Sequence, residues 1–145
     1  MEDVKQKIAE YLKAHNVLTL ARVTADGKPL ASTVEYASDG TTLYISTRRT
    51  TRKIQDITNN SKVAVTVDHD YLNWLEIQGV QMEAIASILT DEEDINKATH
   101  MYVEKFPFVA NFPPNPDRIF IKLDLVQGYF IDYTKGFGYK DEVMF

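Results

Sequence analysis

The sequence of 145 residues contains no cysteine, which excludes disulfide bonds, thiolate metal sites and a cysteine nucleophile. It also lacks any apolar run approaching the roughly 18 residues that a membrane-spanning helix needs. Residues 1–5 are charged and have no apolar core, so they do not resemble a secretory signal. These absences predict a cytoplasmic protein that has no membrane partner.

Basic residues are outnumbered by acidic residues, so the formal net charge is -5 and the isoelectric point is near 5.2. This balance argues against nucleic acid as a partner. An anionic ligand would need a local group of basic residues that acts against the overall field. Apolar residues make up 44% of the chain and charged residues 26%, which is typical of a folded protein. The length predicts a single domain over residues 1–145.

Hydropathy periodicity and turn residues predict the order of the elements. Apolar residues three and four apart predict a helix over 2–15, after which the period changes to two. The further elements are strands over 17–24, 30–36 and 43–47, a helix over 48–57, strands over 62–68 and 74–89, a helix from Thr90 to about Lys105, and strands over 118–124 and 127–133. The first three strands are expected to form a meander.

Four local signals refine this prediction. The Asp26-Gly27 and Asp39-Gly40 pairs predict tight hairpin turns, the first of type I′. Gly79 predicts a bulge or bend in the long strand. A threonine followed three residues later by a glutamate, over residues 90–93, matches a capping box. Residues 106–116 hold four of the five prolines and predict a loop.

Short strands outnumber helices, so alternating β-α-β units do not fit this pattern. The sequence predicts a mainly β fold with minor helical content, namely an antiparallel split β-barrel of six to seven strands and two to three short helices. Closure of such a barrel removes strand edges that would otherwise be exposed.

A basic segment is the strongest functional signal in the chain. Arg48, Arg49, Arg52 and Lys53 place four cations within six positions, at a predicted helix start with Thr50 or Thr51 as N-cap. Cations are unfavourable at a helix start unless an anion is bound there. Free backbone N–H groups, hydroxyls and cations together predict a phosphate site, whereas the competing interpretation is a solvated basic turn.

Other candidate sites are weaker. The histidines, at positions 15, 69 and 100, form no metal-binding pattern, and we predict no metal site. In Asp68-His69-Asp70, neighbouring strand residues point to opposite faces, which disfavours a metal cluster. No residue is marked as a general acid or base, so catalytic residues stay unassigned.

The ordered set of motifs resembles the pyridoxamine 5′-phosphate oxidase-like flavoproteins, which are FMN-binding split β-barrels. The matching segments are Leu43–Thr47, Thr51–Lys53, Asn59-Asn60, Val63–Val67, Gly79–Glu83 with Ala86, and the helix start at Thr90. The resemblance covers roughly residues 10–133.

By position, the resemblance implies an FMN site. The implied phosphate ligands are Thr51, Arg52 and Lys53, with Ser46 and Thr47 at the same site. Ser32, Thr33, Val34, Glu35 and Tyr36 are implied to run along the ribityl chain and ring, largely through their backbone. Gln81 lies near the place of the family's flavin-proximal glutamine.

The resemblance implies a homodimer in which each flavin contacts both chains, with aromatic residues between Phe106 and Phe112 as candidates. It also implies an FMN-dependent oxidoreductase that uses a small-molecule substrate or electron donor. The family's C-terminal tryptophan and arginine are missing, since Trp74 is the only tryptophan, so oxidation of pyridoxamine phosphate is not expected. Two further hypotheses stay open: a non-catalytic flavin carrier, and a binder of deazaflavin or haem.

Overall fold

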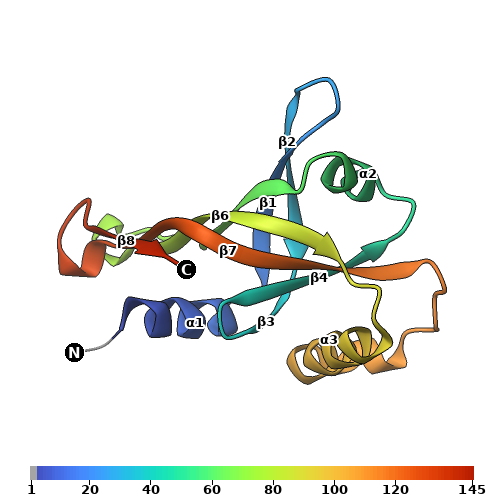
Figure 1. Ribbon diagram of the computed structural model, residues 1–145. Helices are drawn as coiled ribbons and strands as arrows, with labels where there is room; N and C mark the ends of the chain where they lie inside the picture. Colours follow the sequence, from blue (N-terminus) through green and yellow to red (C-terminus); the bar gives the residue numbers. More distant parts are fainter. Residues whose placement is uncertain (1–2) are drawn as a thin grey trace.

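The structure is a computed structural model that describes residues 3–145, and it consists of one curved antiparallel sheet with three helices (Figure 1). The helices are α1 (Val4–Ala14), α2 (Arg52–Asn59) and α3 (Glu92–Lys105). The strands are β1 (Val17–Val23), β2 (Pro29–Glu35), β3 (Ala37–Asp39), β4 (Thr42–Arg48), β5 (Lys62–Val67), β6 (Gln78–Ile88), β7 (Arg118–Asp132) and β8 (Lys140–Met144). Short 3₁₀ turns are η1 (Trp74–Glu76), η2 (Pro107–Asn111) and η3 (Tyr133–Lys135).

The strand order is β2-β1-β5-β6-β7-β4-β3, and β8 pairs with the distal half of β7. Every pairing among the described residues is antiparallel. The two ends of this order curl toward each other, so that β2 contacts β4 without forming a ladder. This open seam between β2 and β4 confirms the predicted split barrel, whose described sheet has eight strands instead of the six to seven expected.

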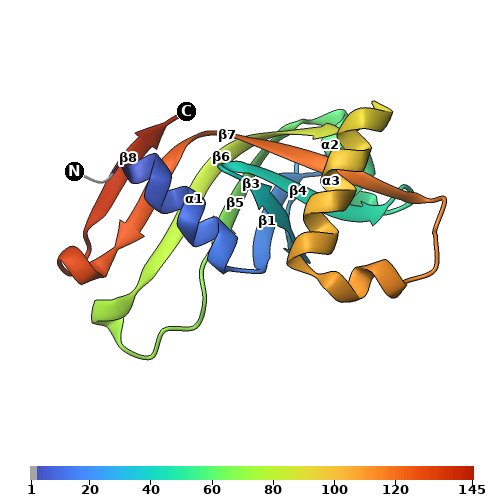
Figure 2. The same cartoon turned by 90° about the horizontal axis from the view of Figure 1, so that it is seen from below.

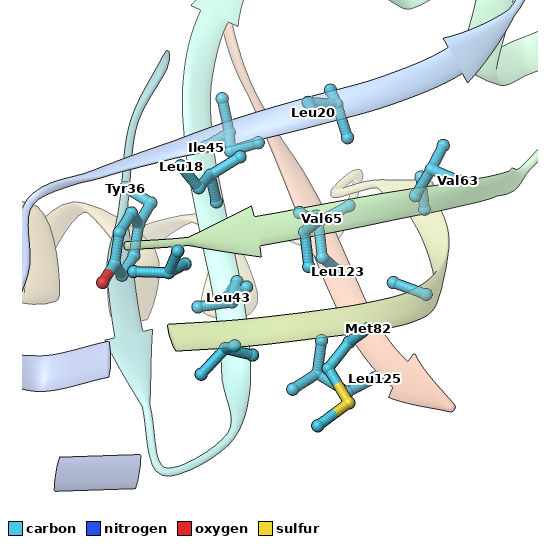
Figure 3. Packing of buried hydrophobic residues seen from close by; sticks show 14 of the residues in the cluster. Leu18, Leu20, Tyr36, Leu43, Ile45, Val63, Val65, Met82, Leu123 and Leu125 are labelled. Carbon is cyan, nitrogen blue, oxygen red and sulfur yellow. The ribbon is translucent and has the colours of Figure 1, made fainter. Parts of the chain in front are cut away.

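The core fills the concave side of the sheet, as Figure 3 shows for part of it. Alternate residues of β1 and β5, such as Leu18, Leu20 and Val65, point inward and are fully buried. Period-two burial of this kind follows from the pleat, which sends successive side chains to opposite faces.

The helices lie on two sides of the sheet. In Figure 1, α1 and α3 lie below β6 and β7, and α2 lies above them. Figure 2 shows α1 and α3 from below.

The hairpins occur where Asp-Gly pairs predict them, but the first turn has a different type. A type I′ turn needs positive φ at both central residues. Gly27 has φ 87°, whereas no described residue other than glycine has a positive φ. Gly27 N donates to Thr24 O, which makes a type I turn followed by a glycine bulge. At the second turn Gly40 has φ 59°, which suits a type II′ turn with Thr41.

Three strand predictions are corrected by long-range pairing. The meander is interrupted at Tyr36, because β2 pairs only with β1 and the short β3 pairs with β4 in its place. Residues 118–132 form one strand, since the register shift opposite Glu83 and Ala84 leaves Val126 outside the pairing without ending β7. Gly79 pairs in regular register, and residues 74–76 form η1 instead of strand.

Two helix predictions are refined by the structure. The helix predicted over 48–57 begins only at Arg52 and extends to Asn59, because Arg48 of β4 still pairs with Arg118. Helix α3 begins after Asp91, not after Thr90, and no side chain caps its start, so the predicted capping box is wrong. The proline-rich segment 106–116 includes the turn η2. Helix α3 ends at Lys105, as predicted.

Candidate functional site

The basic segment lies where strand β4 passes into helix α2. Thr51 is the N-cap of α2, but its side chain makes no cap hydrogen bond. Its Oγ1 donates instead to Arg48 O at 3.1 Å and lies 3.4 Å from Oγ1 of Thr47. As a result the backbone N–H groups of Arg52 and Lys53 bond to no other group among residues 3–145. Two free donors and two hydroxyls therefore meet at the helix start.

The basic side chains at the start of α2 also lack carboxylate partners. No ion pair within 4.0 Å involves Arg48, Arg49, Arg52 or Lys53 in the described part of the chain. The pKa of Asp26 in the β1–β2 turn is lowered, chiefly by a hydrogen bond from Thr24 and to a smaller extent by the charge of Arg52. The site thus has an excess of positive charge and free N–H donors, which is the chemistry that binds phosphate.

A buried ion pair fixes helix α2 to the sheet. Arg22 of β1 donates from Nε to Oδ2 of Asp56 at 2.8 Å, and from a terminal nitrogen to Oγ of Ser32 at 2.8 Å. Both charged side chains are almost fully buried. This network joins β1, β2 and α2, and it sets the position of the helix start relative to the edge strand β2.

The seam between β2 and β4 is closed at one point by a hydroxyl from α3. The Tyr102 hydroxyl accepts a hydrogen bond from Ser46 N at 2.9 Å. It donates toward Glu35 O at 3.0 Å and Tyr44 O at 3.1 Å. Burial raises the pKa of Tyr102, so the hydroxyl stays protonated and able to donate.

The predicted ring-binding residues lie on both faces of β2, except Tyr36, which directly follows the strand. Thr33 and Glu35 are exposed, Ser32 and Val34 are half-buried, and Tyr36 is fully buried, with its hydroxyl donating to Leu12 O at 2.5 Å. Since β2 ends the strand order, its outer backbone edge has no strand partner. Ligand contact by the backbone is therefore possible along this edge.

Gln81 lies far along the sheet from the phosphate-site residues, although it shares a cross-strand row with Thr33 through Thr66 of β5 and Thr19 of β1. It is exposed on β6 and pairs with Tyr129 of β7, whereas Thr47 pairs with Ile119 of the same strand. Ten residues of β7 between those two positions correspond to about 30 Å. Gln81 and Thr47 of one chain therefore do not meet at one small ligand.

A cavity of about 210 Å³ lies beside Ser46, between α3 and the β4–β7 pair. Its walls are formed by Ile95, Thr99, Tyr102, Val103, Val109 and Phe120. Arg118 lies at its edge and donates a hydrogen bond to Ser46 Oγ. Sequence reasoning missed Arg118 and Tyr102, because neither belongs to a local motif and both come from elements distant in the chain.

A second cluster that the sequence does not reveal joins two histidines 54 positions apart. His15 Nε2 lies 3.0 Å from His69 Nδ1, and His69 stacks on Tyr71. His15 Nδ1 faces Tyr11 O at 2.8 Å. Two imidazoles are too few for a metal centre, and no group of three or more metal-ligating side chains is found over residues 3–145.

The fold and the site define a split β-barrel domain with a cationic helix start beside its seam. The family model for pyridoxamine 5′-phosphate oxidase matches residues 4–132, so this chain belongs to that family. The family predicted from the motifs is thereby confirmed.

Individual relatives show how far the likeness extends. General stress protein 26 of Bacillus subtilis (strain 168) is 36% identical over 69 residues, which are 48% of this chain and 49% of that protein. The structure of General Stress Protein 26 from Bacillus anthracis str. Sterne has a TM-score of 0.72 and 24% identity, with 98% of each chain covered. A heme binding protein from Mycobacterium smegmatis has a TM-score of 0.80 and 16% identity, over 99% of this chain and 59% of that one. At these identities the solved structures establish the fold, and this chain spans only part of the heme binding protein.

None of the helices described over residues 3–145 is both long and apolar enough to cross a membrane.

Proposed function

We propose that this chain binds FMN, with the phosphate at the start of α2, and acts as an oxidoreductase on a small-molecule substrate. The observation that carries this proposal is the helix start, where two free backbone N–H groups meet four cations that lack carboxylate partners. Such an arrangement is unfavourable without an anion, and a phosphate monoester supplies both the charge and the acceptor oxygens. FMN, when bound, supplies hydride and electron transfer through its ring.

Each residue of the helix start has a defined part in holding the phosphate. Arg52 and Lys53 provide charge and their backbone N–H groups. Thr47 provides a hydroxyl donor, and the Thr51 hydroxyl, whose oxygen lies 3.4 Å from that of Thr47, becomes a second donor when it turns from Arg48 O to the phosphate. Arg48 or Arg49 adds a further positive charge at the exposed side. Together these groups neutralise a dianion at the protein surface.

The seam gives the rest of the flavin a place next to the phosphate. Strands β2 and β4 contact each other across it, the Tyr102 hydroxyl joins Glu35 to Ser46, and the open edge of β2 offers backbone donors and acceptors. The Arg22–Ser32 and Tyr102–Ser46 hydrogen bonds hold these two strands in position. The described residues supply binding and orientation, and no general acid or base is assigned.

We further propose that the working form is a homodimer. The exposed position of Gln81 on β6, away from the helix start, favours contact with a flavin held by a second copy of the chain. Phe108 and Phe112 keep 58% and 56% of their surface exposed, which favours burial against a partner. The outer face of β1, β2 and β5 carries the small residues Ala21, Ala31 and Ala64 in register, which permits close approach of another sheet.

A second candidate function is haem binding, because a protein of nearly the same fold is described as a heme binding protein. Two more candidates are a flavin carrier without turnover and a deazaflavin protein. Colour separates flavin from haem, since flavin absorbs at about 450 nm and haem at about 400 nm. Steady turnover with NADH or NADPH then distinguishes an enzyme from a carrier.

Titration of FMN and riboflavin into wild type and Arg52→Ala tests the phosphate assignment. Loss of one charge-assisted hydrogen bond of about 1.5–3 kcal/mol should weaken FMN binding about 10- to 150-fold. Riboflavin lacks the phosphate and should bind both proteins equally. Lys62→Ala, which removes an exposed cation at the start of β5, should leave both affinities unchanged. Equal weakening of FMN and riboflavin by Arg52→Ala would refute the assignment.

A further inference from the structure

The cavity beside Ser46 has two chemically different parts. Ile95, Val103, Val109 and Phe120 give it apolar walls, with α3 and η2 on one side and β7 on the other. Figure 2 shows α3 crossing β4 and β7 on this side of the sheet. Water gains few hydrogen bonds from such walls, whereas an apolar group fits them well.

The polar side chains of the cavity are Ser46, Thr99, Tyr102 and Arg118, and Arg118 alone among them carries a charge. Arg118 Nη1 donates to Ser46 Oγ, and the other donors of its guanidinium have no carboxylate within 4.0 Å among the described residues. The fork of an arginine matches the two oxygens of a carboxylate. The Tyr102 hydroxyl, which also lines the cavity, already accepts from Ser46 N and donates toward two carbonyl oxygens. The remaining hydroxyl, that of Thr99, donates to Ile95 O at 2.8 Å, so the free donors at this cavity belong to Arg118.

The volume limits the size of the ligand. A cavity of about 150 Å³ is large enough to take up benzene. About 210 Å³ therefore suits one ring, or an equivalent branched chain, with its charged end outside at Arg118. Ser46 directly precedes Thr47 of the phosphate site in β4, and because successive strand residues point to opposite faces, such a ligand would lie across β4 from the Thr47 hydroxyl.

We propose that this cavity binds the organic substrate, and that the substrate is a small apolar carboxylate whose charged end pairs with Arg118. Its role as a substrate pocket rests on the proposed flavin function. Its capacity to bind carboxylates does not, because that can be measured without flavin.

The test uses benzoate as the probe and benzamide as a neutral molecule of the same shape. Each is titrated into the purified full chain and followed by ¹H–¹⁵N NMR. A ligand of this size should bind with a Kd of about 1–10 mM. Benzoate should shift the amide signals of residues 95–103, 109 and 118–120, and benzamide should bind at least about tenfold more weakly.

Three variants locate the binding. Arg118→Gln should weaken benzoate about tenfold or more and leave benzamide unchanged. Val109→Trp should fill the cavity and abolish binding of both probes, with thermal unfolding confirming that the variant folds. The matched control Lys62→Gln, which removes an exposed cation from β5, should bind like wild type.

Several results would overturn the proposal: equal binding of benzoate and benzamide, no effect of Arg118→Gln, or signal shifts confined to other parts of the chain. A parallel FMN titration separates the two hypotheses. If benzoate binds at Arg118 and FMN does not bind, the pocket stands and the flavin function fails. If FMN binds and benzoate does not, the flavin function stands and the pocket assignment fails.

Discussion

Arg22 and Asp56 form a salt bridge of 2.8 Å in which the side chains keep only 6% and 7% of their surface exposed. Water cannot screen or replace this interaction, so the two charges depend on each other. Asp56 follows the helix start by one turn, and Arg22 also bonds Ser32. The pair therefore determines where the cations of α2 stand relative to β2.

Removal of one partner of the Arg22–Asp56 pair should destabilise the folded protein. Asp56→Ala leaves the Arg22 guanidinium buried without a counter-charge, and we expect a loss of about 3–5 kcal/mol in the free energy of unfolding. Urea denaturation at pH 7 measures this loss. The control Lys97→Ala breaks the exposed 3.0 Å ion pair with Asp39 and should cost about 0–1 kcal/mol. Similar losses for the two variants would contradict the prediction.

Tyr102→Phe should loosen the seam between β2 and β4. The variant leaves Ser46 N without its acceptor, and we expect a loss of about 1–3 kcal/mol in stability. Amide hydrogen exchange of Ser46 should become faster than in wild type. Tyr129→Phe is the matched control, because the Tyr129 hydroxyl has no hydrogen-bond partner in the described structure. Unchanged exchange at Ser46 in Tyr102→Phe would show that this hydroxyl does not hold the seam.

Gly128→Ala should disrupt the pairing of β6 and β7. A Cβ atom at Gly128 would lie 2.0 Å from Gln81 O and 2.8 Å from Met82 Cα, so the backbone itself must move. We expect a loss of at least about 3 kcal/mol in thermal or urea unfolding. Gly79→Ala is the comparison, since its Cβ would meet Val67 O at 3.2 Å and needs a smaller shift. Equal stability of the two variants would contradict the predicted close approach.

Stability should rise with pH above neutrality because of Lys105. Burial lowers the pKa of Lys105 from its ordinary value of 10.5 to about 8. Between these values the unfolded chain binds more protons than the folded one, so the free energy of unfolding increases with pH. The rise in stability should be measured between about pH 8 and 9.5. Above pH 10 the trend is opposed by Tyr36 and Tyr102, whose pKa values are raised by burial.

Lys105→Gln provides the control for this dependence. The stability difference between wild type and Lys105→Gln, measured by urea denaturation at half-unit steps, should change in favour of wild type across the window. A constant difference from pH 7 to 9.5 would show that the Lys105 amine titrates normally.

Local signals in the sequence predict local structure well. Alternation and Asp-Gly pairs predict the hairpins β1–β2 and β3–β4, and the cations with Thr51 predict the start of α2. These features depend on residues within a few positions of each other. For the same reason, the phosphate ligands are the part of the proposed site that sequence reasoning defines most sharply.

Features that depend on distant residues could not be predicted. The seam contact joins Tyr102 to Glu35, 67 positions away, and no local pattern marks it. The continuity of β7 past Asp124 depends on its pairing with β6 and β8. Likewise, Arg118 reaches Ser46 only because β4 and β7 lie side by side, 72 positions apart at that point.

The late position of β7 in the chain affects how the protein folds during synthesis. β7 is the common neighbour of β4, β6 and β8, so β4 and β6 each keep an open edge until residues 118–132 have left the ribosome. Before that moment the nascent chain exposes unpaired strand edges and the core residues that later pack against β7, which is a state prone to aggregation. The barrel is therefore expected to close only after residues 118–132 are available to pair with β4 and β6.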